Sequence, residues 1–183
     1  MIATARAAAL AAAAALLACG EGGVRPNTTL TAADSADQVL EGFATYVTSD
    51  GVRRSRIEAD TAFYYEAAQT AQLRRVRTTF YDPKGAESSR LTADRGTYHA
   101  QDGNMEAEGH VVVTAQDGRR LETEALKFDN KANKISTDRT FRFQRGDEHI
   151  EGNSFNSDPD FKNVVTDRPR GVAGKGMLLP GQQ

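Results

Sequence analysis

Leu91-Thr-Ala-Asp-Arg-Gly-Thr-Tyr98 and Leu121-Glu-Thr-Glu-Ala-Leu-Lys-Phe128 are the two stretches that decide the fold. Each begins with a branched aliphatic residue and carries a short side chain two positions later, which is the alternation of a half-buried strand. Related segments begin at Ile57 and Ile150, so the pattern recurs about every 30 residues. The chain is therefore built from a repeated strand unit.

The apolar residues change phase inside each unit. Leu121, for example, is followed by Leu126 and Phe128, which do not continue its alternation. One inserted residue turns every later side chain to the other face of a strand, so the polar middle of each unit predicts a bulge or corner. Asp60, Asp94 and Glu124 occupy this middle position.

Turn residues separate these units into pairs of strands. Second apolar strands open near Leu73, Met105, Ile135 and Val164. Asp102-Gly103 and Asp117-Gly118 precede or follow such strands and tolerate positive φ. The helix-like stretch 65–72 is short and lies where the repeat needs a turn. So many antiparallel strands must close, form two sheets or cover their edges, so we expect an all-β fold, either an elongated antiparallel β-jellyroll or a partly open sandwich, built from strand-turn-strand repeats.

The N-terminus has the layout of a secretory signal, with one positive charge at Arg6 and an apolar run over 7–18. This run is shorter than the roughly 18–20 residues that a membrane-spanning helix needs. Leu16-Leu17-Ala18-Cys19 resembles the bacterial lipobox, in which a lipid is attached to the cysteine thiol. Cleavage by ordinary signal peptidase is the alternative. Because the chain has 1 cysteine, an internal disulfide is impossible.

Composition divides the chain into four parts. We expect a signal peptide over 1–18, a lipidated N-terminus and flexible tether over 19–36, one β-domain over 37–173 and a flexible tail over 174–183. The 23 basic and 25 acidic residues nearly balance, so net charge indicates no nucleic-acid partner.

No catalytic or metal-binding pattern stands out in the sequence. His99, His110 and His149 lack a second ligand at zinc spacing, and we assign no metal and no cofactor. Phosphate loops and nucleophile elbows are also missing, so we expect no enzyme. Arginine pairs such as Arg119-Arg120 are interpreted as solvated strand ends, with contact to anionic sugar phosphates as the alternative.

The strand units, together with Glu108-Gly-His-Val-Val-Val113 and Gly152-Asn-Ser-Phe-Asn-Ser157, resemble the LptC family. This family supplies the periplasmic component of the lipopolysaccharide export ABC transporter and belongs to the OstA-like group. The resemblance covers 85–172 and, more weakly, 37–64. It implies an elongated, twisted, V-shaped antiparallel β-jellyroll whose inner faces take the acyl chains of lipopolysaccharide.

The same resemblance implies the partners and the place of work. Lipopolysaccharide would come from the membrane subunits of the ABC transporter and pass to an LptA-like periplasmic bridge protein. The chain would be a periplasmic lipoprotein, anchored through Cys19 to the inner membrane. Many family members keep a transmembrane helix where this sequence has a lipobox, which leaves the anchoring membrane open.

Period and phase select the candidate lipid-contact residues. They are Ile57, Leu91, Met105, Val111, Val113, Leu121, Ile135, Phe141 and Phe143. We expect Phe141 and Phe143 on one face and Val111 and Val113 on another, lining the same cavity. The alternative for each of them is ordinary packing in a closed core.

The ends of an open sheet are candidate partner edges, because their backbone groups are unpaired. At the N-terminal end we expect the edge Val39 to Val47, facing the transporter. At the C-terminal end we expect Phe161 to Thr166, with Val164 in its middle, facing the bridge protein. Pairing should stop before Pro169, which cannot donate. Two other functions stay open: a structural or adhesion lipoprotein with a dry core, and a bridge-type carrier.

Overall fold

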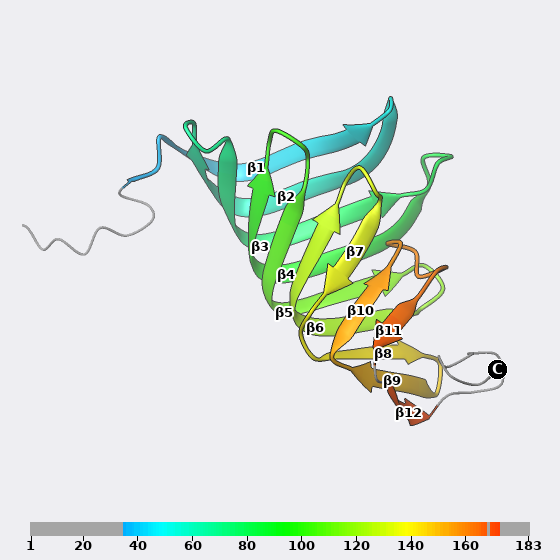
Figure 1. Ribbon diagram of the computed structural model, residues 1–183. Coiled ribbons are helices and arrows are strands. Elements are labelled where there is room, and N and C mark those ends of the chain that lie inside the picture. The colour runs from blue at the N-terminus through cyan, green and yellow to red at the C-terminus, as the bar shows by residue number, and fades with distance from the viewer. Residues whose placement is uncertain (1–34, 168, 173–183) are drawn as a thin grey trace, which may run out of the picture. The chain divides into compact units, whose positions relative to one another are not determined.

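The computed structural model describes residues 35–167 and 169–172, which form a 12-stranded antiparallel sheet (Figure 1). The strands are β1 Gln38–Ser49, β2 Val52–Tyr65, β3 Thr70–Tyr81, β4 Glu87–His99, β5 Met105–Ala115, β6 Arg120–Asp129, β7 Lys134–Thr137, β8 Phe141–Arg145, β9 Glu148–Gly152, β10 Ser154–Ser157, β11 Val165–Asp167 and β12 Arg170–Val172. The predicted all-β jellyroll is confirmed. The predicted domain boundaries at 36 and 173 remain predictions.

A line of bends crosses the long strands. Between β4 and β5 the register shifts in the interval from Thr92 to Arg95, and between β5 and β6 it shifts from Glu108 to Val111. The residues at the middle of this line include Asp60, Asp94 and Glu124, the positions that the change of phase predicted. Bulges of this kind turn a strand sharply and move its side chains to the other face. The predicted bends are therefore confirmed.

The bends divide the sheet into two layers. The first half of β6 pairs with β8 through Leu121 and Phe143, whereas its second half pairs with β7 through Phe128 and Ile135. The first layer continues through β9 to β12, and the second layer continues from β7 to β10 and β11. Each strand from β2 to β6 thus contributes to both layers. In the last unit two separate strands replace one bent strand: β9 belongs to the first layer and β10 to the second.

The core lies between the layers. Phe80 of the first layer packs against Phe128 of the second, with ring centroids 5.0 Å apart in an edge-on arrangement. Thr78 Oγ1 and Met105 Sδ also meet across the layers at 3.4 Å. Phe141 and Phe155 make a similar ring contact at 5.2 Å. These contacts show that the layers face one another directly.

Short turns connect the strands as the sequence predicted. Gly103 and Gly118 have φ of +75° and +85° in the turns after β4 and β5. Within the helix-like stretch 65–72, residues 66–69 form the turn between β2 and β3, with Gln69 at positive φ, and the other residues belong to the two strands. The helix propensity of this stretch does not produce a helix, because the segments on both sides of it pair with each other in the sheet.

Candidate functional site

The predicted lipid-contact residues all lie in the core. Each of them has at most 4% of its surface exposed. They are Ile57, Leu91, Met105, Val111, Val113, Leu121, Ile135, Phe141 and Phe143. The structure therefore brings the whole set into one apolar interior between the two layers.

The predicted division of these residues between two faces is wrong. Val113 pairs with Leu121, and Leu121 pairs with Phe143, so all three stand side by side in the first layer. Val111 and Phe141 follow them in the same alternation and point to the same interior. Sequence alternation gives the face of each strand separately, whereas the pairing register decides which faces coincide. Met105 and Ile135 are the candidates that belong to the second layer, where both pair with Phe128.

The interior between the two layers is closed and does not form an open trough. In the described residues the layers touch through Thr78 and Met105 and through Phe80 and Phe128, so apolar side chains already fill the space between them. An acyl chain would need these contacts to separate, because protein cores pack without room for one. The interior is a binding site only if the layers move apart.

The N-terminal edge strand is β1, as predicted. It pairs with β2 on one side only, and Val39 and Leu40 expose 53% and 41% of their surfaces. Tyr46 is also 53% exposed and lies under the guanidinium of Arg53, 4.5 Å from the ring centroid. Val47, however, is 3% exposed, so only its backbone belongs to the edge.

The predicted C-terminal edge from Phe161 to Thr166 is wrong in its extent. The edge strand β11 begins at Val165, and Val164 stands before it, partly buried against the core. Phe161 has φ +54° and 2% exposure, and its ring meets those of Phe143 and Phe155. Burial of this ring outweighs strand pairing, so the segment 158–163 folds over the core. We call this segment the C-terminal cap.

Hydrogen bonds hold the C-terminal cap in place. Asp158 accepts from the Lys162 N–H and from Asn163 Nδ2, both at 2.6 Å. Arg119, in the turn between β5 and β6, donates to the carbonyl oxygen of Asp160 at 2.9 Å and to that of Phe161. Arg119 also pairs with Asp117, whose carboxyl pKa it lowers through a side-chain hydrogen bond. The interpretation of this arginine as a solvated strand end is therefore wrong.

Charged pairs cover the outside of the bends. Asp60 accepts from Arg77 at 2.9 Å and from Arg75, and these hydrogen bonds lower the pKa of the Asp60 carboxyl. His110 Nδ1 lies 2.7 Å from Asp94 Oδ2, which raises the pKa of the imidazole. Sequence reasoning placed the acids at the bends but missed their partners. The partners stand on neighbouring strands, so only the register reveals them.

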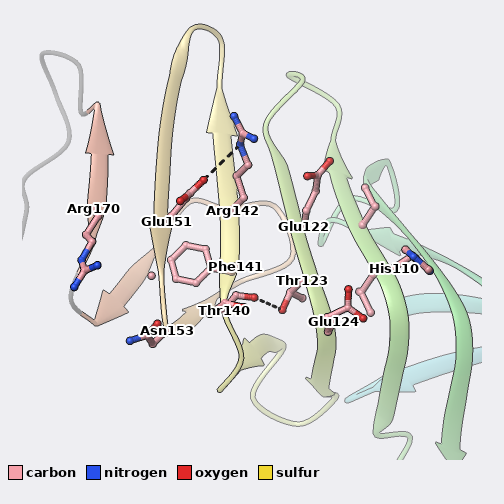
Figure 2. A pocket seen from close by; sticks show the side chains of 13 residues that line it. His110, Glu122, Thr123, Glu124, Thr140, Phe141, Arg142, Glu151, Asn153 and Arg170 are labelled. Carbon is pink, nitrogen blue, oxygen red and sulfur yellow. Dashed lines mark hydrogen bonds and ion pairs between the residues drawn. The ribbon is translucent and has the colours of Figure 1, made fainter.

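A groove of about 660 Å³ lies on the outer face, between β5, β6, β8 and β9 (Figure 2). Glu122, Arg142 and Glu151 line it, and they alternate with the buried residues of the same strands. Arg142 and Glu151 stand 4.0 Å apart, and Thr123 Oγ1 donates to the Thr140 carbonyl at 3.0 Å. The lining is mixed, because Val111, Val112 and Phe141 also contribute to it, and Val111 and Phe141 are two of the predicted lipid-contact residues.

Three further predictions concern membrane, metal and anchor. Within the described residues, no helix is long and apolar enough to cross a membrane. The same residues hold no group of three or more histidine, cysteine or acidic side chains that could bind a metal ion. Cys19 and the signal segment 1–18 lie outside the described residues.

Bent strands, two layers and an apolar interior together define an antiparallel β-jellyroll. The family model for lipopolysaccharide assembly, LptC-related, matches residues 7–164. The chain therefore belongs to the LptC-related family, and its role lies in lipopolysaccharide transport.

A solved structure supports the fold. The chain resembles LptH, the LptA-homologous periplasmic component of the conserved lipopolysaccharide transport device from Pseudomonas aeruginosa, with TM-score 0.54 and 15% identity. The match covers 66% of this chain and 94% of LptH. A search of curated proteins gives no match.

Proposed function

We propose that the chain is a non-enzymatic carrier that receives lipopolysaccharide from the inner-membrane ABC transporter and passes it to an LptA-like periplasmic bridge protein. The observation that carries this proposal is the apolar interior between the two layers, in a member of the LptC-related family. A structural lipoprotein would need the same core but no lipid in it. Lipid binding is therefore the property to test.

A lipid carrier needs apolar surface that can contact acyl chains, and it needs no reactive side chain. Each methylene removed from water contributes about 0.8 kcal/mol, so acyl chains between the layers would offset the cost of separating them. Leu121, Phe143 and Ile135 would then exchange contacts with one another for contacts with lipid. The saccharide would stay outside, in water. Such a cycle transfers a molecule without making or breaking a covalent bond.

The proposed anchor is the lipidated Cys19, which would follow removal of the signal peptide 1–18. The β-domain would then work at the periplasmic face of the inner membrane, close to the transporter. The match of the family model begins at residue 7, so it includes this leader. Lipidation itself stays a prediction.

The proposed partner contacts are the two strands at the ends of the strand order, β1 and β11. Val39 on β1 would face the transporter, and Val165 on β11, which is 64% exposed, would face the bridge protein. Strand addition at such edges satisfies backbone groups that otherwise bond to water. Exposed apolar side chains beside them add buried area on pairing.

Photo-crosslinking from neighbouring residues of one strand tests lipid binding. A photoreactive amino acid replaces Phe143, which faces the interior, or Arg142, which faces the outside of the same strand. Because the two positions share backbone and strand, they differ only in the face that they probe. We expect lipopolysaccharide adducts at 143 and not at 142. Equal labelling at both positions, or none at 143, would contradict the carrier and favour the structural alternative.

A further inference from the structure

The layers meet at the end of β1 through a small set of contacts, which we call the seam: Val47, Thr48, Gly103 and Asn130. Val47 and Thr48 belong to β1, Gly103 to the turn between β4 and β5, and Asn130 to the turn between β6 and β7. Asn130 Nδ2 donates to the Asp102 carbonyl at 3.0 Å and to the Thr48 carbonyl at 3.4 Å. The second of these bonds is long for a hydrogen bond.

The two turns of the second layer form one unit. Asn104 Oδ1 accepts from the Asn130 N–H at 2.9 Å, and Asn104 Nδ2 donates to Asp102 at 2.8 Å. The turns are therefore tied to each other more firmly than to β1. Between β1 and this unit lie one long hydrogen bond and the packing of Val47 over Gly103. Next to the unit, Tyr98 of β4 also makes a side-chain hydrogen bond with Thr45 and packs against Phe43, with ring centroids 6.4 Å apart.

Gly103 fits the seam because it has no side chain. A Cβ at this position would lie 2.7 Å from Val47 Cγ1 and 2.8 Å from Asn130 Nδ2. Such distances are too short for real atoms, so a larger residue would displace the Val47 and Asn130 side chains that form the seam. Gly118 has a similar backbone, with φ +85°, but a Cβ there would meet nothing within 4 Å.

Ser55, Ser89 and Asn130 carry unpartnered buried polar atoms at or near the seam. In the described residues, the buried side-chain nitrogen and oxygen atoms without a hydrogen-bond partner belong to Arg54, Ser55, Ser89 and Asn130. Ser55 pairs with Val47 and with Phe80, and Phe80 pairs with Ser89, so this row lies just inside the seam. Buried polar groups without partners oppose the closed state, because water would satisfy them on opening.

The long hydrogen bond and the unpartnered polar atoms lie at or near the seam, at one end of the apolar interior. The C-terminal cap, by contrast, is closed by the paired hydrogen bonds of Arg119 and by the ring of Phe161. We infer that the apolar interior opens at the seam, and that β1 and the Asn130 turn separate to admit the acyl chains of a lipid. This inference rests on the proposed function, since it names the entry to the same interior.

A disulfide across the seam gives the first test. Val47 Cγ1 is one bond from its Cβ, so the Cβ atoms at 47 and 103 come within reach of the roughly 3.5–4.5 Å that disulfides require. The variant Val47→Cys/Gly103→Cys is made with Cys19→Ser, which removes the 1 native cysteine. Uptake of purified lipopolysaccharide with a fluorescent saccharide is followed in time. We expect the oxidised protein to take it up at least about tenfold more slowly than the reduced protein.

Alanine at two glycines gives the second test. Gly103→Ala and Gly118→Ala carry the same backbone penalty for a side chain at positive φ, but only the first displaces side chains of the seam. We expect faster uptake by Gly103→Ala and unchanged uptake by Gly118→Ala. Circular dichroism checks that both variants fold. If Gly103→Ala does not fold, the oxidised and reduced forms of the disulfide variant still decide the question.

The outcomes separate this inference from the proposed function. Equal uptake by the oxidised and reduced forms overturns entry at the seam and leaves the carrier intact. Failure of the Cys19→Ser protein with its native seam to take up lipopolysaccharide overturns both. Slow uptake that recovers on reduction supports the seam as the entry.

Discussion

The seam and the C-terminal cap both close the same apolar interior, but they do so with different chemistry. At the cap, a guanidinium donates to two backbone carbonyls and Phe161 packs against Phe143 and Phe155. At the seam, one amide reaches Thr48 at 3.4 Å, and its own Oδ1 has no partner. A charged donor and a buried ring stabilise far more than a neutral, half-satisfied amide. The same core is therefore held more strongly at the C-terminal cap than at the seam.

Removal of one buried side chain at each end gives the largest contrast. Phe161→Ala deletes a ring that is 2% exposed, so we expect a loss of about 3–5 kcal/mol in the free energy of unfolding. Val47→Ala deletes two methyl groups next to a turn that moves, and should cost about 1–2 kcal/mol. Urea denaturation measures both. Equal losses would remove the distinction between the ends.

Removal of the polar groups gives a second, smaller contrast. Arg119→Ala leaves two carbonyls without their charged donor, and we expect a loss of about 2–3 kcal/mol. Asn130→Ala removes the long hydrogen bond to Thr48 and the 3.0 Å hydrogen bond to Asp102, but also an unsatisfied buried oxygen, so its cost should be about 1 kcal/mol. Arg120→Ala is the matched control, because Arg120 lies beside Arg119 and pairs with exposed Glu122.

Hydrogen exchange distinguishes local from global effects of these variants. Faster exchange confined to 158–163 in Arg119→Ala would locate its effect at the C-terminal cap. In Asn130→Ala the faster amides should be those near Thr48 and Gly103. Uniform acceleration along the chain in both variants would mean that the two ends do not open separately.

The ion pair at the bend between β4 and β5 should have the smallest effect on stability. The Asp94 carboxylate raises the pKa of His110, whose side chain is 84% exposed. A raised pKa in the folded state means that the ion pair stabilises the fold at low pH and that this contribution is lost as pH rises through that pKa. NMR titration should find the His110 pKa above its ordinary value, and lower in Asp94→Asn. An unchanged pKa in that variant would exclude the contact.

The sequence by itself determined the strands, their turns and the bends. Local periodicity predicted the buried positions in each strand, and the phase change after Asp60, Asp94 and Glu124 predicted the bends, because both depend only on neighbours along the chain. The lipobox at Cys19 and the LptC resemblance were also visible there. The first of these stays a prediction.

Only the tertiary structure decided how the strands meet. It joined Val113, Leu121 and Phe143 into one row, closed the expected trough, and moved Phe161 from an edge strand into the core. It also brought Asn130 to Thr48 and Arg119 to Asp160. These contacts join residues far apart in the chain, and no local period encodes them. Their strength depends on pairing register and on which layer covers which, and both are set by the packing of the whole sheet.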